Sequence, residues 1–209
     1  PFEGEVVVYD LYVLNRGGSR DLKLASMEYG ALIPEPGVDP GEISSQEELD
    51  GLSFRGTHVL VPLRAVSIGR QQIPPTQIRA IIPVDSSEVA RSRGSVERIT
   101  WATPPVKLEV RPLPETGRPA KFSGLVGNFE IAIEADQTSV ELGESITLDI
   151  TIRGDGSLDS LSLPQPPAGA GYRVYDEPAV RQSLLQGDRF IARAEIERTL
   201  VPEASGDVL

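Results

Sequence analysis

The sequence has 209 residues, enough for one large domain or two ordinary ones, and a formal net charge of −11. That charge argues against nucleic acid and anionic membrane surfaces as partners. The absence of cysteine excludes disulfides, thiolate metal sites and cysteine nucleophiles, and 20 glycines with 18 prolines favour an all-β class. No apolar run approaches the roughly 20 residues that span a bilayer, and no signal peptide is visible. Because both ends are abrupt, we expect a fragment of a longer protein.

The chain opens with a strand pattern that recurs later. VVVYDLYVL begins just after Gly4, and SITLDITI begins just after Gly143. The two glycines lie 139 residues apart (143 − 4), and the Leu-Val-Pro at Leu60 recurs at Leu200, 140 residues further on (200 − 60). A repeat of this length predicts two related domains, each the size of an immunoglobulin-like module.

The middle of the first domain is harder to interpret. Prolines and glycines between Pro34 and Gly41 exclude long regular structure. Ser44–Leu49 is predicted to form one helical turn, with a serine as N-cap and a glutamate nearby. Strands are expected near His58–Leu63, Gln77–Ile82 and Val106–Val110. An exposed polar loop is expected at Ser86–Gly94.

A proline-rich segment separates the two domains. We predict an immunoglobulin-like β-sandwich over residues 1–111, a stiff and extended linker over residues 112–121, and a second such sandwich, truncated at its end, over residues 122–209. The expected fold class is therefore all-β, with two tandem immunoglobulin-like β-sandwich domains.

The second domain carries the clearest strand patterns. Apolar residues alternate with mostly polar ones in two runs, which predicts strands with one face on a core: Phe129, Ile131, Ile133 and Ala135, then Ile146, Leu148, Ile150 and Ile152. Later strands are expected at Tyr172–Tyr175 and Arg189–Leu200, where four residues share a face: Phe190, Ala192, Ala194 and Ile196. We expect Leu148 to be buried together with Ile146 and Ile150. In the first domain, Tyr9 and Leu11 should be buried likewise.

Four ordered segments resemble the BatD family of bacterial oxygen-tolerance proteins: PVKLEVRPLPETGRPAKFSG, SGLVGNFEIAIEAD, VELGESITLDITIRGDGSLDSL and YRVYDEP. The resemblance runs from about Pro105 to the C-terminus, and residues 1–104 fit more loosely. In the family's closing segment a strand ends and a glycine turn feeds an Ile-Pro-Pro strand, as after Pro62. One spacing departs from a strict repeat, because the glycine follows Pro62 by 7 residues and Pro202 by 4 (69 − 62 and 206 − 202).

The resemblance implies a membrane-anchored envelope protein whose β-rich ectodomain lies in the periplasm. BatD-like proteins are associated with Bat proteins of the von Willebrand-factor-A type and with a MoxR-type AAA+ ATPase, in stress or oxygen tolerance. On that basis the chain would bind partner Bat ectodomains directly and depend on the ATPase only indirectly. The alternative is a bacterial surface adhesin or a carbohydrate-binding tandem immunoglobulin-like module.

Candidate catalytic and metal-binding residues are few. His58 is the only histidine, so a triad or a histidine zinc site would depend on it alone, and a structural or exposed role is favoured. Four carboxylates could converge at one end of the second domain and hold calcium: Asp155, Asp159, Asp176 and Glu177. Their spacing is not that of an EF-hand loop, and turn formation by Asp155 and Gly156 is favoured.

Candidate residues for a binding surface are also few. Trp101 and Tyr172 could each serve as a sugar-stacking platform, although a core or interface role is favoured. Arg91, Arg93 and Arg98 form a small basic cluster that is better interpreted as a solvated loop. We therefore predict no catalytic, cofactor-binding or metal-binding residues, no cofactor, and a non-enzymatic function carried by exposed strand edges and loop ends.

Overall fold

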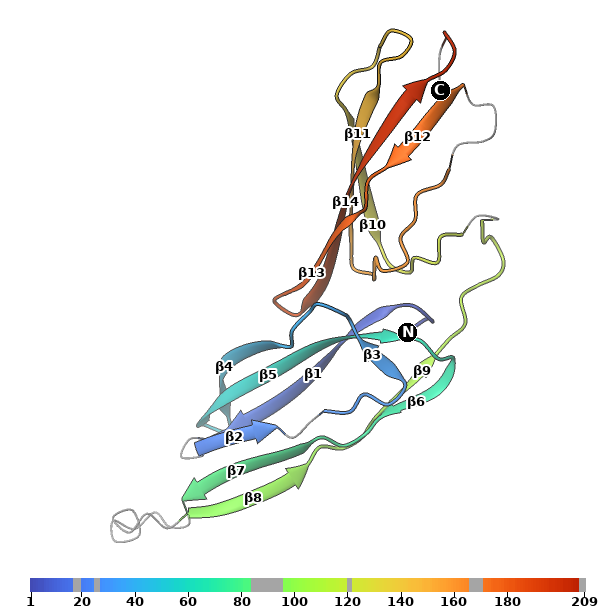
Figure 1. Cartoon of the computed structure of the whole chain (residues 1–209). Coiled ribbons are helices and arrows are strands. Elements are labelled where there is room, and N and C mark those ends of the chain that lie inside the picture. The colour runs from blue at the N-terminus through green and yellow to red at the C-terminus, as the bar shows by residue number, and fades with distance from the viewer. Residues whose placement is uncertain (17–19, 25–26, 84–95, 120–121, 166–170, 207–209) are drawn as a thin grey trace. The chain divides into compact units, whose positions relative to one another are not determined.

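The computed structural model describes residues 1–16, 20–24, 27–83, 96–119, 122–165 and 171–206. These residues form fourteen strands and no helix, arranged in several sheets, so the fold is all-β and consistent with a β-sandwich (Figure 1). The chain divides into two compact units, which we describe separately. Unit 1 comprises Pro1–Glu3 and Val7–Leu113, and unit 2 comprises Gly4–Val6 and Pro114–Leu209.

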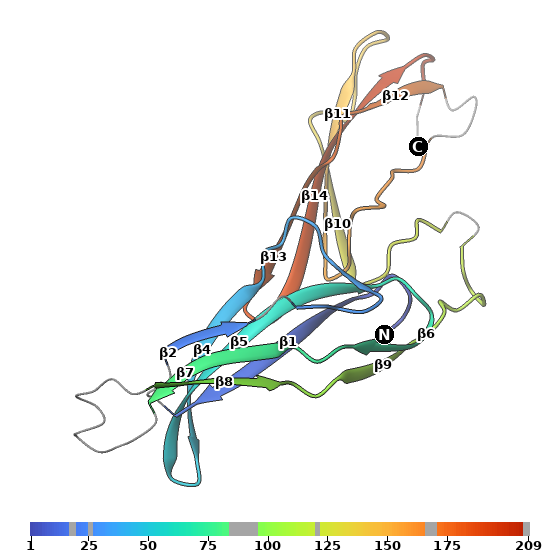
Figure 2. The same ribbon diagram turned by 60° about the horizontal axis from the view of Figure 1, so that its bottom comes forward.

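Unit 1 contains one four-stranded sheet and two smaller ones. In the four-stranded sheet a long central strand pairs with three others: β5 (Leu52–Ala65) with β1 (Val6–Asn15), β3 (Leu32–Pro34) and β4 (Gly41–Leu49). Figure 2 shows the smaller sheets, which are β2 (Arg20–Leu24), β7 (Gln77–Pro83) and β8 (Val96–Ala102) in one, and β6 (Gly69–Ile73) with β9 (Val106–Val110) in the other. The strands predicted at Gln77–Ile82 and Val106–Val110 are therefore confirmed.

The core of unit 1 lies between these layers. Apolar residues of β1, β3 and β5 pack against Ile73 of β6 and Ile78 of β7. The members from the four-stranded sheet are Tyr9, Leu11, Val13, Leu32, Val61 and Leu63, and Leu63 has no exposed surface. The predicted burial of Tyr9 and Leu11 is confirmed. Alternation along β1 places Asp10 and Tyr12 on the opposite, outer face of the sheet.

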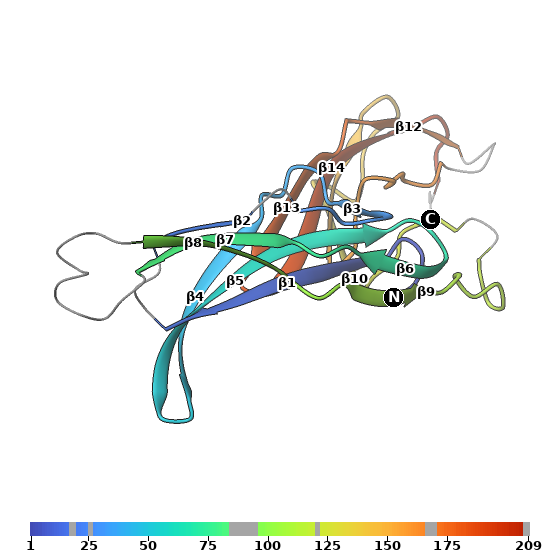
Figure 3. The same ribbon diagram turned by 90° about the horizontal axis from the view of Figure 1, so that it is seen from below.

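The predicted helical turn at Ser44–Leu49 is wrong, because this segment is strand β4. It pairs with β5 through a two-residue turn formed by Asp50 (φ 52°) and Gly51 (φ 72°). Positive φ at both positions is the geometry of a type I′ hairpin, which Asp-Gly favours. The hairpin also extends β5 back to Leu52, well before the predicted start at His58. Figure 3 shows the hairpin projecting beyond the neighbouring strands.

In the described residues of unit 2 the strands form one five-stranded antiparallel sheet. The long strand β14 (Arg189–Pro202) pairs with β11 (Ile146–Gly154) along one side, and β11 pairs with β10 (Phe129–Ala135). Along its other side β14 pairs first with β13 (Val180–Gln186) and then with β12 (Tyr172–Asp176). Figure 1 shows β12 and β13 following one another along this side of β14.

One face of this sheet is apolar, but only its centre is buried. Ile150, Ile152 and the four predicted residues of β14 have exposures of 6% or less, which confirms the shared face of Phe190, Ala192, Ala194 and Ile196. The expected burial of Leu148 and Ile146 is wrong in degree, since both are half-buried. The expected core face of β10 is also wrong. Ile131 and Ile133 are 63% and 60% exposed, because β10 is at the margin of the sheet and nothing in the described residues covers it.

A coil after β11 covers the buried centre of this face. Leu158 is 3% exposed, and Arg181 donates to the carbonyl oxygens of Leu158 (3.0 Å) and Leu161 (3.1 Å). The coil begins at Gly156, where a Cβ would meet the Val126 carbonyl and the ring of Phe129. Only glycine allows the chain to turn so closely over the sheet.

The predicted linker is described only in part, and the predicted loop is not described. In residues 112–119 the Arg118 N–H donates to the Glu115 carbonyl (3.2 Å), with Gly117 at φ 82°, so a turn interrupts the extended segment that we expected. The loop predicted at Ser86–Gly94, which includes Arg91 and Arg93, lies outside the described residues.

Candidate functional site

His58 lies on the outer face of the four-stranded sheet of unit 1, where it meets two residues of β1. Its Nδ1 is 2.8 Å from Oδ2 of Asp10 and 3.1 Å from Oδ1. The Tyr12 ring stacks on the imidazole, with ring centroids 4.1 Å apart and an interplanar angle of 17°. Tyr12 also lies over Gly56, where a Cβ would come within 2.7 Å of the tyrosine ring. The cluster therefore depends on a glycine beneath an aromatic pair.

This cluster contains a base and its orienting carboxylate. Partial desolvation raises the pKa of the Tyr12 hydroxyl, and the nearby Glu47 carboxylate raises it further. Among the described residues Asp10 is the only hydrogen-bond partner of the His58 ring. General base catalysis also needs a nucleophile or a substrate proton within hydrogen-bond reach. The contacts of His58 thus orient its ring against Asp10 and stack it on Tyr12. They do not include the nucleophile that a catalytic triad needs.

The four carboxylates considered for calcium do not converge. Asp155 accepts hydrogen bonds from the Asn128 backbone N–H (2.7 Å) and side-chain amide (2.8 Å). Burial alone would raise the pKa of Asp155, but these two bonds outweigh it and lower the pKa. No group of three or more histidine, aspartate or glutamate side chains that could hold a metal occurs in the described part of the chain. Asp155 instead joins the start of β10 to the turn after β11.

Asp176 is paired with the side chain of Arg198. Its Oδ1 accepts from Nε of Arg198 at 2.6 Å and its Oδ2 from Nη2 at 2.8 Å, a two-point pairing of the kind that suits guanidinium and carboxylate. The Arg198 hydrogen bonds lower the pKa of Asp176, and they outweigh the effect of burial. Arg198 also donates to the carbonyl of Pro164 (3.1 Å), so the pair fastens the covering coil to the sheet.

The two aromatic residues considered for sugar stacking lie in different units. Trp101 is 40% exposed on β8, the last strand of its sheet in unit 1. Tyr172 is half-buried at the start of β12 in unit 2. Arg98 lies on β8 and is exposed.

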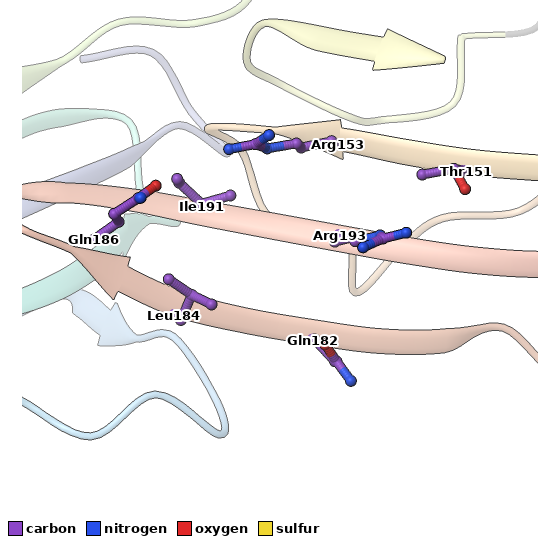
Figure 4. Close-up of a pocket in the computed structure, with 7 residues that line it drawn as sticks. All are labelled: Thr151, Arg153, Gln182, Leu184, Gln186, Ile191 and Arg193. Carbon is purple, nitrogen blue, oxygen red and sulfur yellow. The ribbon is translucent and has the colours of Figure 1, made fainter. Parts of the chain in front are cut away.

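A shallow concavity of about 550 Å³ lies on the polar face of the unit 2 sheet (Figure 4). The strand register places Arg153 of β11 directly beside Arg193 of β14. Arg193 is paired with Glu195 at 2.6 Å, with both side chains about half exposed. Leu184 and Ile191 supply apolar surface to the same hollow. The arginines of this hollow could bind a carboxylate. Glu195 already neutralises part of their charge, and the hollow is open to solvent, which weakens ion pairing.

The most unusual surface is the free edge of unit 2, formed by β10. Ile131 and Ile133 lie beside the buried residues Ile152 and Ile150 in the register, yet they are more than half exposed. In the described residues β10 pairs with β11 alone, so its other side carries unpaired backbone groups. The sequence shows this strand as an alternation of apolar and polar residues, but that alternation predicted burial and did not reveal the exposed edge.

Comparison of the chain with family models, with curated proteins and with solved structures finds no match. Within the described residues no helical segment has the length and hydropathy of a membrane span.

Proposed function

We propose that this chain is a non-enzymatic scaffold, a protein-interaction part of a BatD-like envelope protein. The observation that carries the proposal is the exposed aliphatic edge at β10, where Ile131 and Ile133 are 63% and 60% exposed. Large aliphatic side chains gathered beside unpaired backbone are the usual means by which one protein adds to the sheet of another. No comparable convergence of titratable side chains in a cleft supports a catalytic function among the described residues.

The two units support a tandem relationship through their strand pairing. In unit 1, β5 pairs with β1 on one side and with β3 and β4 on the other, and in unit 2, β14 pairs in the same pattern with β11 and with β12 and β13. The offsets of 139 and 140 residues match β1 to β11 and β5 to β14. We therefore propose that both units are immunoglobulin-like modules of one repeat, in which a coil takes the place of the second sheet in the described residues of unit 2.

The proposed partners come from the family resemblance. They are Bat proteins of the von Willebrand-factor-A type, with the MoxR-type ATPase acting through them, and the proposed location is the periplasmic side of the cell envelope. An acidic surface, with a net charge of −11, favours protein partners over nucleic acid.

The test is capture of partners with this chain as bait from solubilised envelope fractions of a bacterium that encodes a BatD-like protein. The expected result is selective recovery of a von Willebrand-factor-A-type Bat protein, confirmed with purified components. Recovery of no envelope protein, together with binding to glycans on an array, would support the adhesin alternative and overturn the scaffold.

A further inference from the structure

The backbone of β10 is arranged to receive another strand. Just outside the two ends of β10, the Asp136 N–H donates to the Thr147 carbonyl and the Asp155 N–H donates to the Asn128 carbonyl. Residues 128 and 136 are both even-numbered, so in this register the even-numbered residues of β10 make the backbone hydrogen bonds to β11. In an antiparallel pair the intervening residues point their N–H and C=O groups the other way. Ile131 and Ile133 therefore present both an exposed side chain and outward backbone groups.

The polar face beside this edge carries one acidic row. The register sets Glu134 of β10 beside Asp149 of β11, and Asp149 beside Glu197 of β14, so three carboxylates cross the sheet in one row. All three are exposed, and no cation pairs with any of them in the described residues. Like charges directly opposite one another on adjacent strands destabilise a sheet. A cation on a strand added beside Glu134 would reduce this repulsion.

Charge disfavours one way in which a second copy of this chain could pair with the edge. Antiparallel pairing of two β10 strands centred on Ala132 would match the backbone groups of Ile131 with those of Ile133. The same pairing would set Glu130 of one copy opposite Glu134 of the other, twice. Such pairs repel, so charge disfavours this register of self-pairing, while the edge remains open to a strand of opposite charge.

Given the proposed protein-binding function, we propose that β10 binds an extended segment of a partner protein in which aliphatic residues alternate with lysine or arginine. The aliphatic side chains would lie beside Ile131 and Ile133 and cover the uncovered margin of the apolar face. One basic side chain would lie beside Glu134 and neutralise the acidic row, and another would lie beside Glu130, whose neighbour on β11 is Arg153. The backbone groups of Ile131 and Ile133 would supply the hydrogen bonds.

The direct test uses two synthetic heptapeptides, matched in length to the seven residues of β10. One alternates valine with lysine and the other alternates valine with glutamate, each with a fluorescent label. Fluorescence anisotropy with the whole chain should show saturable binding of the lysine peptide and none of the glutamate peptide. Equal binding of both peptides, or binding of neither, would contradict the proposal.

Two variants locate the binding. Ile133→Pro removes an outward N–H and leaves the bonds to β11 in place, so the sheet should tolerate it while strand addition is lost. We expect affinity for the lysine peptide to fall at least roughly tenfold, the effect of about 1.4 kcal/mol.

The second variant, Glu134→Lys, also relieves the repulsion with Asp149. It should weaken binding of the lysine peptide and allow the glutamate peptide to bind. Unchanged binding by a folded Glu134→Lys variant would refute the charge selectivity even if Ile133→Pro failed to fold.

The outcome separates this inference from the proposed function. A partner captured by the wild-type chain and still captured by Ile133→Pro would leave the scaffold function standing and overturn strand addition at β10. Binding of the lysine peptide without capture of any envelope protein would support the edge and count against the scaffold.

Discussion

Four strands of each unit pair in the same pattern, but the two units cover their apolar faces differently. An offset of 139 residues aligns Tyr9, Leu11 and Val13 with Leu148, Ile150 and Ile152. The last two pairs are equally buried, with exposures between 3% and 7%, whereas Tyr9 is 9% exposed and Leu148 is only half-buried. Strands β6 and β7 cover the face in unit 1, and a coil fastened by arginines covers only the centre in unit 2.

Strand pairing and coverage of the apolar face are therefore separate properties of a sheet. Main-chain hydrogen bonds and alternation establish which residues share a face, and both act locally or between neighbouring strands. Burial needs a second layer, whose presence depends on segments elsewhere in the chain or in another protein. The margin of the unit 2 face is therefore exposed in the described residues, while the aligned residues of unit 1 are buried in its core.

The largest effect should follow truncation under the second layer of unit 1. Leu63→Ala should lower the free energy of unfolding of unit 1 by about 2–5 kcal/mol, because Leu63 is fully buried and leaves a cavity. Trp101 is the only tryptophan and lies in unit 1, so its fluorescence during urea denaturation reports this unit. A midpoint equal to that of the wild type would show that the layers do not pack as described.

In unit 2 the position along β11 should matter. Ile150→Ala should cost about 2–5 kcal/mol, and Leu148→Ala about 1–2 kcal/mol, because Leu148 is already partly in contact with water. Far-UV circular dichroism during urea denaturation follows both variants, since this unit contains no tryptophan. Equal losses in the two variants would mean that the face near Leu148 is covered in solution.

The sequence was sufficient for the elements that depend on local pattern. Alternation predicts β10, β11 and most of β14. The Asp50-Gly51 dipeptide between Leu49 and Leu52 is also a hairpin signal, but the serines followed by glutamates in the same segment favour a helical turn, and the two signals conflict. The alternation could not show that Ile131 is exposed, because exposure depends on what lies over the face. The contact of His58 with Asp10, 48 residues away, likewise depends on the pairing of distant strands.

The coil of unit 2 should be sensitive to acid. The pKa of Asp176 is lowered in the folded state, first by its hydrogen bonds with Arg198. Its stabilising contribution is therefore complete above the unfolded value of about 3.9 and is lost as the pH falls through the lower folded value. Thermal melts from pH 6 to pH 3 should show a steeper loss of stability for the wild type than for Asp176→Asn.

The control for this pH series is Asp188→Asn, in the exposed turn between β13 and β14. This variant should follow the wild-type curve. If Asp176→Asn also followed the wild-type curve, the pairing with Arg198 would contribute nothing to holding the coil on the sheet.

The smallest effect should come from the exposed margin. Ile131→Thr should change the free energy of unfolding of unit 2 by less than about 0.5 kcal/mol, because the side chain is 63% exposed and threonine suits a strand equally well. Its neighbour in the register, Ile152, is 3% exposed, and Ile152→Thr should be strongly destabilising because it buries a hydroxyl and removes a packed methyl group. Urea denaturation followed by circular dichroism compares the two directly. Similar losses in both would mean that β10 is covered in the isolated chain, so its edge would not be free to bind a partner strand.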